Sequence, residues 1–185
     1  MEYSVDLSKF SVGTFDKGAG KTKIVLWYFV NALFVRPSIF PFKGMKKCFL
    51  RSFGAKLGKN INIKPGVLIK SPWFLEIGDN CWIGENVWID NLDKVKIGNN
   101  VCISQGALLL TGNHDYKVSN MPYRNGEIVI EDGAWVGGRA VVCSGVTVQK
   151  NALLTVGSVA TRDLEANGIY QGNPAIKIRE RIIEK

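Results

Sequence analysis

Histidine is nearly absent from this chain of 185 residues, which contains only His114. A single histidine excludes metal sites built from several histidines, so we expect no bound metal. The four cysteines show no CxxC spacing, which favours reduced thiols in a cytosolic protein over disulfides.

Long apolar runs are also missing. The longest, from Ile24 to Val35, is interrupted by Asn31. A run of about 12 residues is too short to span a bilayer, which takes about 20. The first residues, MEYSVDLSKF, lack a charged segment followed by an apolar one. We therefore expect no signal peptide and a cytoplasmic protein.

Acidic residues are scarce in the first third of the chain. Residues 1–60 hold 11 Lys/Arg and 3 Asp/Glu, whereas residues 61–185 hold 13 of each, so the whole net charge of +8 lies in the first segment. A basic segment beside an apolar one favours an acidic partner, such as a membrane surface or a phosphate-bearing ligand. Nucleic acid would fit the charge alone, but the sequence has no readout motif, so we expect none.

The sequence is rich in a six-residue period. An aliphatic residue recurs at the same place in each hexad: Leu57, Ile63, Ile69, Ile77, Ile83, Ile89, Ile97, Ile103, Leu109, Ile130, Val136, Val142, Val148 and Leu154. This period is typical of a parallel β-helix, in which each hexad is one short strand and one corner. Three hexads make one triangular coil.

Irregular steps follow every third hexad. The steps after Ile69 and Ile89 take eight residues, and the step after Leu109 takes twenty-one. The extra residues therefore stack at one corner, and the longest insertion, residues 110–129, contains His114. Long insertions in rigid solenoids are common places for function.

Stacking of the coils aligns residues on the outer faces. Two outward columns carry three tryptophans: Asn62, Trp82, Cys102 and Trp135 in one, and Leu68, Trp88, Leu108 and Val141 in the other. Such columns should not face water, so either the N-terminal helix or a neighbouring subunit covers them. The narrow core also favours association, and we expect an oligomer.

The chain divides into three segments. Residues 1–56 form an arm and an apolar, basic helical segment, with a helix over 21–35 and a second short helix within 40–53. Residues 57–159 form the β-helix. Residues 160–185 form a tail, whose end, AIKIRERIIEK, is expected to be a short helix.

The insertion is the candidate site. Asn113 and Asp115 flank His114, and Asp90 and Asn91 lie one coil below on the same corner. Histidine titrates near neutral pH and can accept a proton there. We predict His114 as the catalytic residue and the other four as substrate-binding, with Asp115 a candidate to orient the imidazole. A solvated loop histidine is the alternative.

Several segments resemble the hexapeptide-repeat O-acetyltransferases, which include the galactoside, maltose and xenobiotic acetyltransferases. These segments are TGNHDY (111–116), DGAWVGGRAVV (132–142), GSVATRD (157–163) and QGNPA (171–175). The N-terminal apolar helix, LRSFGAKLG (50–58) and WIGENVWIDNL (82–92) are similar to the colanic-acid-type, exopolysaccharide biosynthesis members. The resemblance covers nearly the whole chain. It implies an all-β, left-handed parallel β-helix that is usually a homotrimer with active sites between subunits.

The resemblance also implies acetyl-CoA-dependent transfer of an acetyl group to a sugar hydroxyl of an exopolysaccharide or saccharide precursor. His114 would take the hydroxyl proton as the oxygen attacks the thioester, with direct transfer in a ternary complex. Relatives commonly carry an asparagine at the position of Asp90, so the acceptor contact differs here.

Coenzyme A is placed by the resemblance near the C-terminal coils. The implied positions are Trp135, Gly138, Val156, Thr161, Arg162, Lys177 and Arg179. Gly138 lacks a Cβ, which lets a ligand approach the backbone. The alternative for Trp135 is that it packs in an interface between subunits. The alternative for Arg162, Lys177 and Arg179 is that they are solvated side chains of the tail.

Other interpretations remain open. The chain could be a non-catalytic scaffold, or an acetyltransferase for a different small hydroxyl or amine acceptor. The γ-type carbonic anhydrases, which the repeat also resembles, need three histidines around zinc. Residues 21–53 could associate peripherally with the inner face of a membrane, near lipid-linked acceptors, or pack on the β-helix.

Overall fold

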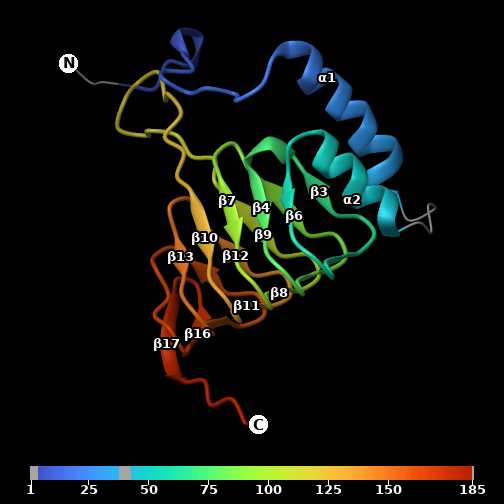
Figure 1. Ribbon diagram of the computed structural model, residues 1–185. Helices are drawn as coiled ribbons and strands as arrows, with labels where there is room; N and C mark the ends of the chain where they lie inside the picture. The colour runs from blue at the N-terminus through green and yellow to red at the C-terminus, as the bar shows by residue number, and fades with distance from the viewer. Residues whose placement is uncertain (1–3, 38–42, 185) are drawn as a thin grey trace.

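The computed structural model describes residues 4–37 and 43–184 (Figure 1). Most of the chain winds into a parallel β-helix with three flat faces, as predicted, and each face is one sheet. The first sheet holds β1 (Lys56–Leu57), β4 (Leu75–Ile77), β7 (Val95–Ile97), β10 (Ile128–Ile130) and β13 (Thr147–Val148). The second holds β2 (Asn62–Ile63), β5 (Trp82–Ile83), β8 (Cys102–Ile103), β11 (Trp135–Val136), β14 (Leu153–Leu154), β16 (Gly168–Gly172) and β17 (Ala175–Glu180). The third holds β3 (Leu68–Ile69), β6 (Trp88–Asp90), β9 (Leu108–Leu110), β12 (Val141–Val142) and β15 (Val159–Ala160).

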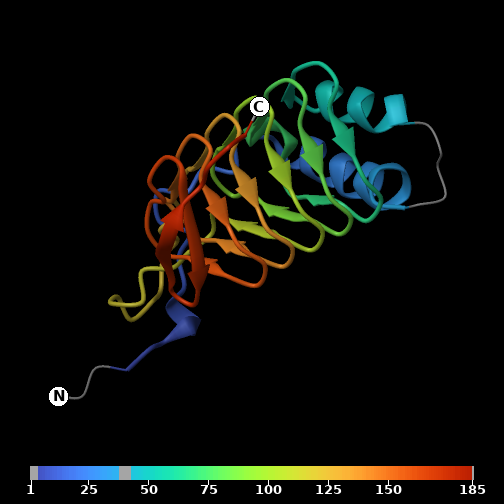
Figure 2. The same cartoon turned by 90° about the horizontal axis from the view of Figure 1, so that it is seen from below.

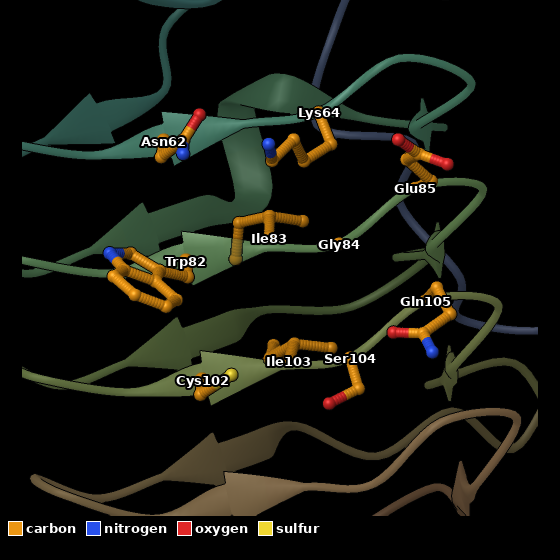
Figure 3. A pocket seen from close by; sticks show the side chains of 10 residues that line it. All are labelled: Asn62, Lys64, Trp82, Ile83, Gly84, Glu85, Cys102, Ile103, Ser104 and Gln105. Atoms are coloured by element: carbon orange, nitrogen blue, oxygen red, sulfur yellow. The ribbon is translucent and has the colours of Figure 1, made fainter.

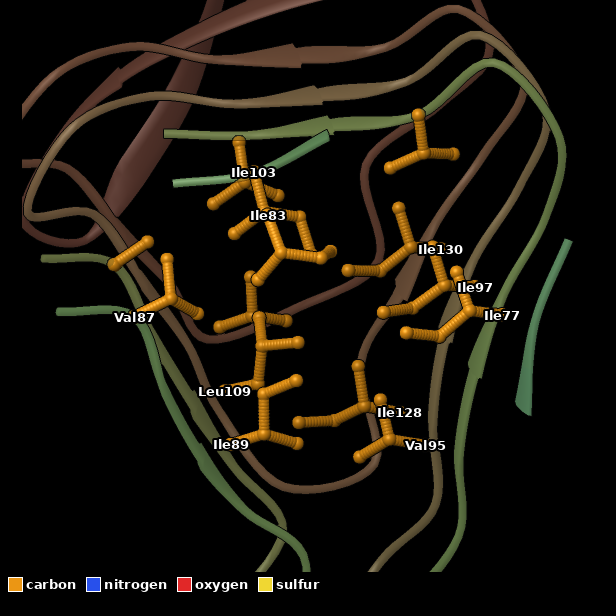
Figure 4. Close-up of a cluster of buried hydrophobic side chains, with 14 of the residues drawn as sticks. Ile77, Ile83, Val87, Ile89, Val95, Ile97, Ile103, Leu109, Ile128 and Ile130 are labelled. Atoms are coloured by element: carbon orange, nitrogen blue, oxygen red, sulfur yellow. The ribbon is translucent and has the colours of Figure 1, made fainter. Parts of the chain in front are cut away.

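The aliphatic position of each hexad points into the coil. Of the fourteen predicted inward residues, Leu57 is half-buried and the other thirteen are buried. Figure 4 shows Ile83, Ile103, Ile97 and Ile130 meeting inside the triangular section. Burying a side chain of this size is worth about 1.5–3 kcal/mol, so the stacked aliphatics are the main source of stability.

Asparagine shapes one of the corners. Asn60, Asn80 and Asn100 occupy the same turn in successive coils, with φ between 53° and 57°. Asparagine enters this left-handed region more readily than most residues because its short side chain can hydrogen-bond locally. Asn60 Nδ2 donates to Asn80 Oδ1 at 3.1 Å, so the corner is also tied from coil to coil.

The N-terminal helices cap the first coil. The predicted helix over 21–35 is confirmed as α1 (Lys21–Val30) continued by the π-helical turn η2 (Asn31–Val35), and the second short helix as α2 (Lys43–Ser52). Residues 40–42 of the predicted second segment lie outside the described residues. Trp27 Nε1 donates to the carbonyl of Ile69 at 2.9 Å and so satisfies an edge acceptor of the first coil. Figure 2 shows the coils stacked between these helices and the C-terminal strands.

Because α1 caps the end of the solenoid, it leaves the tryptophan columns uncovered. Trp82, Trp88 and Trp135 are 65 %, 45 % and 42 % exposed. Their predicted stacking register is confirmed, since Trp82 and Trp135 both pair with Cys102. In the described parts of the chain, no helix is long and apolar enough to cross a membrane.

The predicted C-terminal helix is wrong. The chain forms β16, which pairs in parallel with β14, and then returns as β17, antiparallel to β16. Ile176 and Ile178 alternate with Lys177 and Arg179, and this period of two is a strand pattern. Pairing with β16 satisfies the hydrogen-bonding groups of the β17 backbone, which in a helix would bond within the helix itself. This pairing also closes the last coil. Residue 185 of the predicted tail lies outside the description.

Candidate functional site

The longest insertion connects β9 to β10, as predicted, and is held by its own backbone. Asp115 N donates to the carbonyl of Pro122 at 2.9 Å, and Arg124 N donates to the carbonyl of Asn113 at 2.8 Å. His114 and Tyr123 form an antiparallel bridge between the two halves. The insertion is therefore a folded hairpin that gives His114 a defined place.

The imidazole of His114 is held by one nitrogen. Its Nδ1 lies 2.7 Å from the carbonyl oxygen of Met121. A carbonyl only accepts, so Nδ1 carries a proton, and in the neutral tautomer with this proton Nε2 is the acceptor. Met121 has a φ of 44°, which is uncommon for a residue with a side chain and stores strain beside the ring.

Aromatic side chains fix the plane of the imidazole. Tyr123 stacks on it, with ring centroids 4.8 Å apart and planes inclined by 28°. Phe10, from the N-terminal arm, meets the His114 ring edge-on at 6.0 Å and the Tyr123 ring at 5.6 Å. The arm is tied to the insertion by a hydrogen bond of 2.9 Å from Asp6 N to the Ser119 carbonyl.

The two polar neighbours of His114 bind loop backbone. Asn113 Oδ1 accepts from the N–H of His114 at 2.8 Å, and Asp115 Oδ1 accepts from the N–H of Lys117 at 3.1 Å. The carbonyl of Met121 thus orients the imidazole, which is the role that the sequence analysis considered for Asp115.

Asn91 belongs to the coil. It is fully buried, its Oδ1 accepts from Ser71 N at 2.9 Å, and its Nδ2 donates to Ser71 O at 2.6 Å. Both polar atoms of the side chain are therefore occupied, and we assign Asn91 a structural role in place of the predicted substrate contact.

Asp90 forms the root of the insertion. Its carbonyl accepts from the hydroxyl of Thr111 at 3.0 Å, and its carboxylate pairs with Lys70 Nζ at 2.8 Å. Asp90 is 8 % exposed, whereas the Lys70 side chain is half-exposed. Sequence reasoning missed Lys70, although its position one coil before Asp90 in the register was a usable signal.

Gly138 and Val156 lie on another corner, between the second and third sheets. Arg139 N donates to the Gln105 carbonyl, and Gly157 N donates to the Gly138 carbonyl, both at 2.9 Å, so these positions stack in successive coils. A shallow hollow on the second sheet adjoins this corner and is lined by Trp82 and Gln105 among others (Figure 3).

Trp135 is fastened on that same sheet. Its Nε1 donates to the Ser104 hydroxyl at 2.8 Å. Because Trp135 is 42 % exposed, it remains accessible to a ligand or to a neighbouring molecule.

The predicted phosphate-binding residues differ in availability. Thr161, Arg162 and Arg179 are exposed. Lys177 Nζ lies 2.7 Å from Glu180 and 3.0 Å from Glu165, and these hydrogen bonds raise the pKa of Lys177. Its charge is already neutralised by two carboxylates, so it is poorly placed to bind a phosphate.

The predicted residues therefore form two groups. His114 and Asp90 lie at the corner between the third and first sheets, whereas Gly138 and Val156 lie at the corner between the second and third. Thr161 and Arg162, which follow β15, lie at the first of these corners and are thus on the same side as His114. Within one chain, the whole third sheet separates the two corners. Among residues 4–37 and 43–184, no group of three or more His, Cys, Asp or Glu could hold a metal ion.

Comparison with known proteins gives relatives of full length. No family model matches the chain. The chain is 37 % identical over 177 residues to the colanic acid biosynthesis acetyltransferase WcaF of Escherichia coli (strain K12), which covers 96 % of this chain and 97 % of that protein. It is 29 % identical over 140 residues to the galactoside O-acetyltransferase of the same organism, covering 73 % and 68 % of the two chains.

Solved structures share the fold. The acetyltransferase VCA0836 of Vibrio cholerae O1 biovar eltor, complexed with acetyl coenzyme A, superposes with a TM-score of 0.81 at 22 % identity, over 95 % of this chain and 97 % of that one. A galactoside acetyltransferase in complex with coenzyme A gives 0.76 at 23 % identity, over 86 % and 80 %. Together with the 37 % identity to a full-length relative, this shows that the chain belongs to the hexapeptide-repeat acetyltransferases and has their left-handed β-helix.

Proposed function

We propose that this protein transfers the acetyl group of acetyl-CoA to a sugar hydroxyl of an exopolysaccharide or saccharide precursor, with His114 as the general base. The observation that carries the proposal is the 2.7 Å contact between His114 Nδ1 and the Met121 carbonyl. It leaves Nε2 as the proton acceptor on a ring whose plane is fixed by Tyr123. The colanic acid and galactoside acetyltransferases among the relatives support a saccharide acceptor.

The reaction follows from this arrangement. Nε2 takes the proton of the acceptor hydroxyl while that oxygen attacks the thioester carbonyl. The carbonyl of Met121 accepts from Nδ1–H throughout and stabilises the imidazolium that forms. Collapse of the tetrahedral intermediate forms the ester and breaks the C–S bond, and the imidazolium returns its proton to the departing thiolate. General-base help of this kind is worth about 10²–10⁴ in rate.

Direct transfer is preferred to an acetyl-cysteine intermediate. Burial raises the pKa of the thiols of Cys81 and Cys143, so both stay protonated and weakly nucleophilic near neutral pH. Cys143 is the closer in sequence to the insertion, but no base is paired with it in the described structure.

We infer that the active site forms between subunits of a homotrimer. The His114 corner and the Gly138 corner are separated by a full sheet within one chain, and a second copy would bring its own Gly138 corner to the first copy's His114. Trp82, Trp88 and Trp135 are exposed on the faces that such a contact would cover. A head-to-tail contact of this kind closes into a ring when the rotation allows.

Coenzyme A is assigned to the Gly138 corner. The acetyl coenzyme A complex of VCA0836 supports this donor. Gly138 and the exposed Val156 leave room for an extended ligand, and Arg179 is exposed on β17, where it could meet the phosphates of that ligand. Arg162 follows β15 at the His114 corner, so it would meet the phosphates from the neighbouring copy. Lys177 is left out because Glu165 and Glu180 already neutralise it.

The test is release of free coenzyme A from acetyl-CoA, with a panel of sugar nucleotides and lipid-linked saccharides as acceptors. We expect His114→Ala to reduce kcat by about 10²–10⁴ with the best acceptor. Lys150→Gln removes an exposed charge at the corner between the first and second sheets, away from both the His114 and the Gly138 corners, and as the matched control it should act like the wild type. Equal rates for the wild type and His114→Ala would contradict the assignment of His114 as the general base. If acetyl-CoA did not raise the melting temperature, the result would favour a non-catalytic scaffold protein.

A further inference from the structure

The outer face of α1 is apolar and uncovered. Four residues on it and one on the continuing turn η2 are between 55 % and 69 % exposed: Val25, Leu26, Tyr28 and Phe29 of α1, and Leu33 of η2. Residues three and four apart share a helix face, so these side chains form one stripe. The opposite face is already occupied, because Trp27 and Val35 are buried against the first coil. Contiguous apolar surface of this kind usually marks an interaction site.

The segment of sequence that carries this stripe is basic. Between Asp16 and Glu76 the sequence contains twelve Lys and Arg and no acidic residue. Lys21 is exposed and borders a shallow hollow together with Val25 and Phe29. Arg36 is exposed where η2 ends. Cations therefore stand at both ends of the apolar stripe, although Glu85 lines a shallow hollow together with Arg36 at one end. A partner that offers apolar and anionic groups together fits this surface.

We propose that this face of α1 docks on the surface of an anionic lipid bilayer. The apolar stripe would enter the boundary of the acyl chains, while the cations would meet lipid phosphates. A second copy presenting the same face would bring cations against cations, which opposes association. Nucleic acid offers phosphates but nothing apolar to cover Leu26 and Phe29.

The length of the helix sets its orientation. The helical run of α1 and η2, Lys21 to Val35, rises about 22 Å at 1.5 Å per residue. A bilayer core is about 30 Å thick, so the helix lies along the surface. Figure 1 shows α1 at the end of the solenoid, on the outside of the molecule, where a flat surface can reach it.

Co-sedimentation of the full-length protein with vesicles tests the proposal. One set of vesicles is phosphatidylcholine alone and the other contains phosphatidylglycerol as well, both at low salt. We expect binding to the anionic set, and a loss at high salt. Phe29→Ser should weaken that binding at least about tenfold, because a large apolar side chain no longer leaves water. Lys21→Gln should weaken it about fivefold.

Matched controls keep the result interpretable. Ile182→Ser removes an apolar side chain that is 85 % exposed, and Lys150→Gln removes an exposed charge, both far from α1. Both should bind like the wild type. Thermal unfolding should show that Phe29→Ser remains folded, and Val25→Ser provides a second variant if it does not.

Three outcomes would overturn the docking proposal. These are no binding to anionic vesicles, equal binding by wild type and Phe29→Ser, and self-association at low salt that Phe29→Ser abolishes, which would assign the face to a second copy. Acetyl transfer to a water-soluble sugar without vesicles should be the same in Phe29→Ser as in the wild type. Failure of docking is therefore distinguishable from failure of the acetyltransferase proposal.

Discussion

The regular coils and the insertion between β9 and β10 use their polar side chains in different ways. In the coils, polar atoms bind other parts of the coil, as Asn91 does with Ser71. In the insertion, Asn113 likewise holds loop backbone, but His114 keeps one ring nitrogen out of the hydrogen-bond network. The proposed base therefore differs from its polar neighbours in having one ring nitrogen without a hydrogen-bond partner among the described residues.

The two regions also differ in what packs them. The coils are held by aliphatic side chains that arrive at fixed intervals along the sequence. The insertion is held by aromatic rings from distant segments, with Phe10 and Phe15 of the arm against Tyr123. Substitutions in the coils should therefore change stability, and substitutions in the insertion should change activity.

Ile89→Ala should produce the largest effect. Ile89 is completely buried in β6, and the cavity left by its truncation should lower the free energy of unfolding by about 2–5 kcal/mol. Denaturant unfolding measures the change, with Val118→Ala on the insertion as the exposed control. Similar losses from the two substitutions would contradict the division between coil and insertion.

Asn91→Ala should have the next largest effect. It leaves the N–H and carbonyl of buried Ser71 without partners, which costs about 1–3 kcal/mol of stability. The KM for the saccharide should not change beyond what partial unfolding explains. A raised KM for the saccharide with unchanged stability would show that Asn91 contacts the substrate, and would contradict the difference drawn here between the coils and the insertion.

Tyr123→Leu should have the smallest effect in energy but the clearest in kinetics. Without the stacked ring the imidazole is less well positioned, and we expect kcat to fall about tenfold, or about 1.4 kcal/mol. The melting temperature and the KM for acetyl-CoA should stay near those of the wild type. Tyr123→Phe keeps the ring and should restore kcat; if it fails to do so, Tyr123 acts through its hydroxyl.

Much of the fold was predictable because the hexad is a local pattern that sets the strands and the corners of each coil, whereas the left hand of the coil came only from the family resemblance. Each aliphatic residue needs only its own strand and the coil above or below, so the inward positions, the register and the corner of the insertion all followed from counting. His114 and Asp90 were found in the same way, since both lie at that corner.

The features that sequence analysis missed depend on contacts between residues far apart in the sequence, or on contacts made by the backbone. The partner of the imidazole is the backbone carbonyl of Met121. Every residue has such a carbonyl, so the amino-acid type at position 121 could not indicate this contact. Phe10 reaches His114 across more than a hundred residues. The tail became β17 because β16 offered an open edge, and this tertiary preference overrode the expected helix.

The different closures at the two ends of the solenoid bear on its solubility. A parallel β-helix without closures would present a complete strand edge at each end, a template for end-to-end filament growth. Here α1 and α2 occupy one end, and at the other β17 runs antiparallel and carries Lys177, Arg179 and Glu180. Charged side chains on an edge strand discourage further pairing. The number of stacked coils is thereby limited to those the chain itself encodes.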